Sequence, residues 1–420
     1  MKQFSYTSAQ WVLVILTAIE TACASYFTKN NVAYIPLTSI VYFLSGLMIG
    51  LIPLHRFAAV LHNPKSLYIQ IHRIAIIVFF CFGMYYLIPH VYWVFSWIKI
   101  DYHAADMIPQ IQVACQRFFF GEKVYAPMPE VWGMLPTYLP MMWLPYLPIY
   151  LTGGDVRWTS VYFFIAAIAL LLWMLGSLKK INWGQLLLIL VCIGNLIFIQ
   201  TDYNRNFFAW TEEGVVVGYY ILLGFGLSKK RPFLTGIAIT CCLLSRYSLF
   251  FWIPAYLIYQ YFSGRRNHAI IEAVIITFLT TILFIIPYFS TNATYFLHLP
   301  QNYSNVIKQI WLHSYDQIEK SLGFAKFFQV SQVTWLHTFD IFLAAAVPVI
   351  FYSILYLKRK SNKINFTFSG LCGLKLTLTF FYNFLEAPFF SYLYIVPTLF
   401  SYVILFHFLN SESQQLIKDV

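Results

Sequence analysis

Residues 158–200 read WTSVYFFIAAIALLLWMLGSLKKINWGQLLLILVCIGNLIFIQ, which is a pair of apolar runs separated by Lys179-Lys180. Each run has about the 20 residues that an α-helix needs to cross the roughly 30 Å apolar core of a bilayer. Neither run alternates apolar and polar residues, as the strands of a membrane barrel would. The stretch therefore predicts membrane-spanning helices joined by a short basic turn.

Such runs recur along the whole chain of 420 residues, of which 60% are hydrophobic, 20% aromatic and only 10% charged. The mean hydropathy is +0.67. A soluble protein needs more charge on its surface, so we expect one all-α integral membrane domain over residues 1–420. The predicted spans lie at about 9–27, 35–54, 74–98, 158–178, 182–200, 213–228, 232–246, 249–263, 269–289, 339–357, 364–382 and 388–409.

The segment 138–151 is apolar but short and interrupted by prolines. It is either re-entrant or a further short span, so the pattern predicts a bundle of about 11–13 transmembrane helices.

The formal net charge of +11 comes from basic residues in short clusters between the spans, such as Lys229-Lys230-Arg231 and Arg265-Arg266. Clusters of this kind mark cytoplasmic loops, and they argue against a partner such as nucleic acid. The opposite, extracytoplasmic side then receives most acidic residues, in the loops at 99–137, 201–212, 290–338 and 383–387. The seven cysteines lie mostly inside apolar runs and show no metal-ligand spacing.

The loop at 99–137 carries the polar residues that suggest chemistry. It opens with IDYHAAD, in which Asp101 and Asp106 come just after a span. From Met107 to Phe120 apolar residues recur at helical spacing with glutamines between them, which predicts an amphipathic helix lying on the membrane. Gly121 ends this helix, and a proline-rich segment leads back to the bilayer. A loop of this kind would form a roof over a cavity between spans.

Several pieces of this loop follow one another in a recognisable order. They are Asp106, then Gly121 and Tyr125 in a Gly-x-x-x-Tyr pattern, then Tyr138 and Pro140 in a Tyr-x-Pro pattern. The stretch 211–254, TEEGVVVGYYILLGFGLSKKRPFLTGIAITCCLLSRYSLFFWIP, adds a basic turn, a glycine-rich span and a basic residue before a proline. Over about residues 100–260 the chain resembles the GT-C superfamily of polytopic glycosyltransferases. Within it, the chain is most similar to glycosyltransferase family 87, mannosyltransferases that use polyprenol-phosphate-mannose.

The chain also departs from the family pattern. Glu212-Glu213 stand where the family has a glutamine before the span, and Arg246 stands where it has a lysine. The proline that follows comes late, at Pro254, and two extra spans precede the loop. These departures bear on which sugar donor the protein uses more than on which fold it adopts.

The resemblance implies transfer of a hexose, mannose in the family, from a polyprenyl phosphate to a glycolipid or glycan acceptor. The chemistry of the reaction requires the same groups. A lipid phosphate is a good leaving group, so the remaining need is one carboxylate that takes the proton of the acceptor hydroxyl. Such a general base raises the reaction rate about 10²–10⁴-fold. A cation should face the leaving phosphate. We expect the base to be Asp106, whose spacing to Gly121 matches the family, or else Asp101, and the cation to be Arg246.

A displacement with one base inverts the anomeric centre. The plain alternative is that one of the aspartates only caps the amphipathic helix, because aspartate is a favoured N-cap residue.

Further residues are candidates for substrate binding, each with a structural alternative. His103 would assist the base or simply lie at the interface. Glu212-Glu213 would hold acceptor hydroxyls or form a solvated helix end. Arg117 and Arg205 would bind phosphate or pair with local acids. Tyr138 would stack on the sugar or anchor the chain at the interface.

Lys375 and Glu386 lie in or next to a late span. An intramembrane charge is a candidate site residue by default, and the alternative for Lys375 is that its amine extends to the membrane surface.

We expect no metal and no cofactor beyond the lipid-phosphate sugar itself, because this donor lacks the pyrophosphate that usually requires a divalent ion. The expected partners are that donor, a glycolipid or glycan acceptor and membrane lipids, in a bacterial inner membrane. The competing hypotheses are a flippase or transporter of lipid-linked sugars, a polymerase or ligase of surface glycans, and a membrane scaffold. The chain has no internal repeat typical of a transporter, its outer loop is short for a polymerase, and its buried charges argue against a scaffold.

Overall fold

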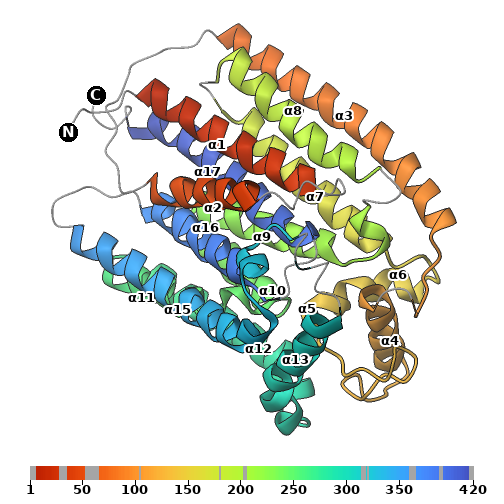
Figure 1. Ribbon diagram of the computed structural model, residues 1–420. Coiled ribbons are helices and arrows are strands. Elements are labelled where there is room, and N and C mark those ends of the chain that lie inside the picture. The colour runs from red at the N-terminus through yellow and green to blue at the C-terminus, as the bar shows by residue number, and fades with distance from the viewer. Residues whose placement is uncertain are drawn as a thin grey trace.

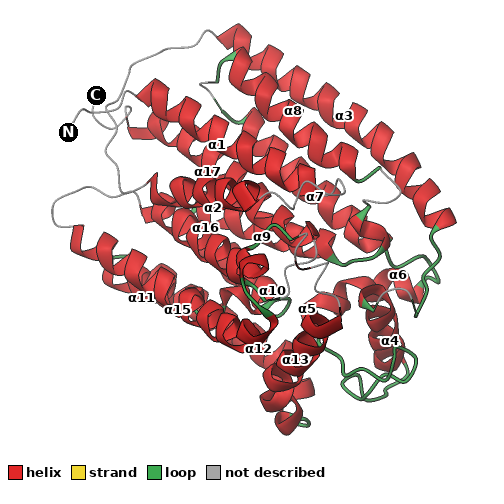
Figure 2. Ribbon diagram, in the orientation of Figure 1, coloured by secondary structure: helices red, strands yellow, loops and turns green. Residues whose placement is uncertain are grey.

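The computed structural model describes residues 6–27, 36–52, 66–103, 106–178, 181–201, 206–313, 318, 321–358, 366–386 and 391–415. Within these ranges the protein is all helical, as Figure 2 shows, and the β-structure is limited to one isolated bridge between Met128 and Met134. The predicted all-α fold is confirmed.

Most of the main helices coincide within a few residues with the predicted spans. The main helices are α1 (Tyr6–Phe27), α2 (Pro36–Leu51), α3 (Ser66–Trp97), α7 (Trp158–Gly176), α8 (Trp183–Ile199), α9 (Glu213–Lys229), α10 (Pro232–Leu243), α11 (Trp252–Phe262), α12 (Arg266–Thr280), α15 (Val333–Lys358), α16 (Phe366–Phe384) and α17 (Ile395–Gln415). Two begin earlier than predicted, α3 at Ser66 and α15 at Val333, and α17 begins later, at Ile395, and ends later, at Gln415. A π-helical stretch, η6 (Thr281–Phe289), extends α12.

Shorter helices lie between them: α4 (Met107–Phe119), α5 (Pro140–Trp143), η3 (Leu144–Tyr146), α6 (Leu147–Leu151), η4 (Phe207–Ala209), η5 (Tyr247–Leu249), α13 (Ala293–His313), η7 (Phe324–Phe327), η8 (Val330–Gln332) and η9 (Ser391–Tyr394).

By length and composition, six helical segments are able to cross a membrane: Ser8–Ser25, Gln70–Trp97, Trp158–Gly176, Arg266–Phe289, Val330–Lys358 and Tyr392–Asn410. Three shorter helices, α2, α8 and α10, are also apolar. The long helix α3 turns many large apolar side chains outward, including Phe82 and Tyr85. An apolar surface of this extent is typical of contact with lipid.

The helices run between two ends of the molecule. One, which we call the basic end, carries Arg73, Lys229, Arg231, Arg265 and Lys358. The other, the α4 end, carries α4, α5, α6 and α13 (Figure 1). Helices α1, α3, α8, α10, α12 and α16 run toward the α4 end, and α2, α7, α9, α11, α15 and α17 run back.

Specific contacts fix these directions. Arg73, in the first part of α3, donates from Nε to the carbonyl of Gly176 at the end of α7, at 3.0 Å. His337, at the start of α15, lies 2.7 Å from Glu386, which follows the end of α16. The predicted separation of basic clusters from Asp106, Glu212 and Glu386 is thus present in the fold.

The segment 138–151 forms three short helical pieces, α5, η3 and α6, that stay at the α4 end. Pro140, Pro145 and Pro148 each lack a backbone N–H, which explains the breaks. The Met141 N–H instead donates to the carbonyl of Leu244, just beyond α10, at 3.0 Å. The chain therefore returns to the end from which it came, as the re-entrant alternative predicted.

A buried ion pair joins the first helix to the last two. The ammonium of Lys375 in α16 lies 2.7 Å from Glu20 Oε1 in α1, and both side chains are inaccessible to solvent. Lys375 also donates to the carbonyl of Pro397 at 2.8 Å, and Ser401 donates to the other oxygen of Glu20. Lys375 does not extend to the surface; it binds α1 to α16 and α17.

Helices α7 and α9 approach closely at Gly214. A Cβ atom there would overlap the backbone carbonyl of Ser160 in α7. Because backbone atoms cannot rotate out of the way, the site requires glycine.

We predict that Gly214→Ala lowers the midpoint of thermal unfolding in detergent, because overpacking of a tight contact costs about 1–3 kcal/mol. Gly83→Ala is the matched control, since its new Cβ would lie 3.5 Å from Ile197, an ordinary contact. Equal midpoints for Gly214→Ala and wild type would contradict this packing.

Candidate active site

The amphipathic helix predicted from Met107 to Phe120 is present as α4. Its N-cap is Asp106, and Gly121 follows it with a φ of +69°, the left-handed conformation that favours glycine at a helix end. One face, with Ile108, Ile111 and Cys115, is buried against α5, η3 and α6, while the aromatic residues at its end are exposed. The helix is therefore packed on protein as well as placed at the edge of the bundle.

Asp106 occupies the N-cap position without acting as a cap, because its side chain accepts no capping hydrogen bond. Its carboxylate instead accepts a hydrogen bond from Gln110 Nε2 at 3.2 Å, and the side chain is half-buried. Burial raises the pKa of Asp106 above its ordinary value, although backbone N–H groups and Gln110 oppose the shift. Among the described residues, no cation pairs with this carboxylate.

Gln110 links Asp106 to the segment that follows the loop. Its amide oxygen accepts from the backbone N–H and the hydroxyl of Thr137, at 3.3 and 3.4 Å. The next residue, Tyr138, donates its hydroxyl to Glu212 Oε2 at 3.4 Å. Burial, followed by the charges of Glu212 and Asp106, raises the pKa of Tyr138 well above its usual range. Tyr138 is therefore a neutral donor that lies between these two carboxyl groups.

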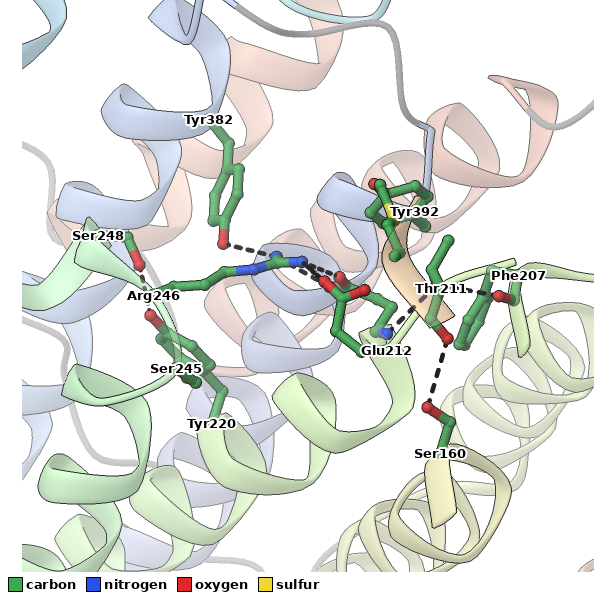
Figure 3. Close-up of polar contacts among 12 residues, drawn as sticks. Ser160, Phe207, Thr211, Glu212, Tyr220, Ser245, Arg246, Ser248, Tyr382 and Tyr392 are labelled. Atoms are coloured by element: carbon green, nitrogen blue, oxygen red, sulfur yellow. Dashed lines mark hydrogen bonds and ion pairs between the residues drawn. The ribbon is translucent and has the colours of Figure 1, made fainter. Parts of the chain in front are cut away.

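Glu212, which accepts from Tyr138, belongs to a group of three charged side chains with Glu213 and Arg246. Figure 3 shows Arg246 pointing toward Glu212 and Tyr382. Arg246, in the break between α10 and η5, meets Glu213 through both terminal nitrogens, at 3.3 and 2.5 Å. Its contact with Glu212 is longer, at 3.5 Å. This fork-to-fork geometry is the strongest arrangement for arginine and a carboxylate.

Two tyrosines that the sequence did not single out complete the site. Tyr382, near the end of α16, accepts a hydrogen bond from Arg246 at 3.2 Å. Tyr392, in η9, donates to the sulfur of Met107 at 3.2 Å and so contacts the first turn of α4. They lie more than a hundred residues from Arg246, and tyrosine is common throughout this chain, so no local signal marks them.

The remaining predicted site residues lie elsewhere. Asp101 and His103 are exposed, and among the described residues the Asp101 carboxylate accepts the nearby backbone N–H of His103, at 2.8 Å. Arg117 is buried and donates to the carbonyls of residues 124, 126 and 127, with Glu130 at 3.7 Å. These contacts hold the loop after α4, and phosphate binding by Arg117 stays a prediction. Arg205 falls outside the described residues.

A small pocket lies next to Asp106, beneath α4. Its walls are aromatic and include Tyr125, Tyr138 and Trp143, and Gln110 closes one side. Tyr125 donates to the carbonyl of Tyr138 at 2.9 Å and accepts from the indole of Trp143 at 3.4 Å. Aromatic faces beside a few hydrogen-bonding groups are common features of ligand sites.

The charge of the site is unusual for phosphate binding. Two carboxyl groups, Glu212 and Glu213, share the cation Arg246, and the charge of a third, Asp106, acts on Glu212 and Tyr138. The sequence predicted Arg246 and the glutamates as separate contacts to donor and acceptor. In the structure they hold one another, because residues 33 and 34 positions apart are brought together where α10 ends beside the start of α9.

We predict that Arg246→Met strongly destabilises the protein, because breaking a buried pair leaves an uncompensated charge and costs about 3–5 kcal/mol. The double variant Glu213→Gln/Arg246→Met should recover part of this loss, since it removes one orphaned carboxylate. Thermal unfolding in detergent measures both. If the double variant were no more stable than Arg246→Met, the pair would not be a coupled unit.

A scan against models of known protein families, a search of curated proteins and a search of solved structures each find no match to this chain.

Proposed function

We propose that this protein is a polytopic membrane glycosyltransferase with a GT-C-like fold. It would move a hexose, with mannose as the first candidate, from a polyprenyl-phosphate donor to a glycolipid or glycan acceptor. The α4 end would face the extracytoplasmic side of a bacterial inner membrane, since the basic clusters of the other end follow the positive-inside pattern. The observation that carries the proposal is the carboxylate of Asp106.

Asp106 has the properties of a general base. It is half-buried, the one side chain that donates to it in the described part of the protein is the neutral Gln110, and no described cation neutralises it. Gln110, which donates to Asp106, lines the aromatic pocket together with Tyr138. A base must lie within reach of the hydroxyl that it deprotonates, so the proposal requires the acceptor to bind on the Asp106 side of Gln110.

The reaction would proceed by one displacement. The acceptor oxygen forms a bond to the anomeric carbon as the bond from that carbon to the phosphate oxygen breaks. Asp106 takes the hydroxyl proton, and the lipid phosphate leaves with the bonding electron pair. Attack from the face opposite the leaving group inverts the anomeric centre.

The proposed role of Arg246 follows from its contacts. The leaving phosphate needs a cation, yet the guanidinium already holds Glu213 with both nitrogens. The longer, 3.5 Å contact to Glu212 is the one that a phosphate oxygen would replace. Glu212 would keep its hydrogen bond from Tyr138 and remain near the acceptor. The absence of a metal and of any further cofactor stays a prediction.

Asp106→Asn should abolish sugar transfer, with a loss of about 10²–10⁴-fold, because asparagine cannot take the proton. The assay is transfer from a radiolabelled polyprenyl-phosphate sugar by purified protein in lipid, with membrane extract as acceptor. Asp101→Asn is the matched control, because Asp101 is exposed and its contact within the described part of the chain is to local backbone.

Loss in both aspartate variants, or in neither, would overturn the role of Asp106. Label that crosses a vesicle bilayer without being transferred would replace the enzyme hypothesis with the flippase.

The pH profile provides a second test. Transfer requires ionised Asp106, so activity should fall as the pH drops through its pKa, which lies above the ordinary 3.8. The hydrogen bond from Gln110 lowers this pKa, so Gln110→Leu should move the acid limb of the profile to higher pH. The matched control is Gln112→Leu, on the same helix as Gln110, which removes the hydrogen bond that Gln112 accepts from Tyr102. This variant should leave the acid limb in place. An unmoved limb in Gln110→Leu would exclude Asp106 as the group that titrates.

A further inference from the structure

A second pocket lies at the basic end, where α9, α10, α11, α12 and α16 meet. The side chains that matter for its chemistry are Lys230, Arg265 and His268, together with Gln260 and Glu272. It is separated from the candidate active site by the length of α9, since Glu213 begins that helix and Lys230 follows its end. At 1.5 Å per residue, the 17 residues of α9 place the two sites about 25 Å apart.

The inner part of this pocket offers hydrogen-bond acceptors. Gln260 and Glu272 are 1% and 2% exposed. The Gln260 amide nitrogen donates to Tyr256 at 3.3 Å and to Glu272 Oε1 at 3.4 Å. This leaves Gln260 Oε1 and Glu272 Oε2 buried, and neither has a hydrogen-bond partner within the described part of the chain. Buried acceptors without donors are costly, so a ligand that donates hydrogen bonds there would bind favourably.

The outer part of the pocket carries positive charge. Lys230 is exposed, and Arg265 and His268 are half-buried. The guanidinium of Arg265 lies 4.7 Å from the ring centre of Phe366, which holds it at the pocket edge. The carboxyl group in the inner part would repel a simple anion. A ligand with a positive group at its inner end and a negative group at its outer end would match both parts of the pocket.

We propose that this pocket binds a phosphoethanolamine group, with its primary ammonium on Gln260 and Glu272 and its phosphate on Arg265, His268 and Lys230. The order of burial matches the order of the charges along the headgroup of phosphatidylethanolamine, in which the ammonium is at the tip and the phosphate is closer to the acyl chains. Ile271, the neighbour of Glu272 in α12, is exposed and offers an apolar side chain for those chains. Basic pockets between helices at the cytoplasmic side commonly bind lipid headgroups.

The ammonium is the selective element. A primary ammonium donates hydrogen bonds to both buried acceptors, whereas the trimethylammonium of phosphatidylcholine has no N–H to donate. A headgroup without an amine, such as that of phosphatidylglycerol, offers no ammonium to Gln260 and Glu272. The site therefore predicts a preference among lipids that share the same phosphate.

The experiment is native mass spectrometry of the delipidated full-length protein with phosphatidylethanolamine, phosphatidylcholine or phosphatidylglycerol of matched chains. We expect phosphatidylethanolamine to bind about tenfold more tightly than phosphatidylcholine, as a charge-assisted hydrogen bond would give. Glu272→Gln should abolish this preference, and Arg265→Gln should weaken both lipids. Arg266→Gln is the matched control, because Arg266 lies over Tyr261 and does not line the pocket.

Equal affinity of the wild type for phosphatidylethanolamine and phosphatidylcholine would overturn the proposal, as would an unchanged preference in Glu272→Gln. Thermal unfolding shows whether Glu272→Gln folds. If Glu272→Gln does not fold, Gln260→Met, which also removes an acceptor, should reduce the preference for phosphatidylethanolamine. Free phosphoethanolamine is added as a competitor. Displacement of the lipid at millimolar concentration would assign the site to a soluble ligand, and no displacement would assign it to the membrane lipid.

Discussion

The pairing of Arg246 with Glu213 is the interaction on which the candidate site depends. An arginine in the interior of a membrane protein needs compensation for the water that it loses, and here two carboxylates and a tyrosine hydroxyl provide it. The group joins the start of α9, the break after α10 and the end of α16. Tyr138 connects it to the loop in which Asp106 lies, so a charge inside the bundle helps to position a carboxylate at its edge.

The fold separates two kinds of surface along the same helices. At the α4 end, short broken helices close over the bundle and bring acidic and aromatic side chains together. At the basic end, tight turns between α9 and α10 and between α11 and α12 bring cations beside buried acceptors. Helices α10 and α11, of 12 and 11 residues, are only about 18 Å long. Their connection, which carries Arg246, is therefore covered by α5 through the contact between Met141 and Leu244.

Helical positions could be predicted because apolar runs of sufficient length have few alternatives in a membrane. The amphipathic helix after Asp106 and its end at Gly121 were predicted for the same kind of local reason. Local patterns could not show whether residues 138–151 cross the bilayer, since prolines are compatible with both outcomes. Only the hydrogen bond to Leu244 and the direction of α7 settle that point.

The sequence by itself determined the class of the protein, the approximate bounds of its helices, the separation of charge between its ends and the candidacy of Asp106 and Arg246. The tertiary structure alone separated Asp106 from Asp101, because exposure and neighbours depend on residues far along the chain. It alone paired Arg246 with the two glutamates, added Tyr382 and Tyr392, and assigned Lys375 to Glu20. Local composition controls which segments become helices, whereas the partner of a buried charge is chosen by packing between helices that are distant in sequence.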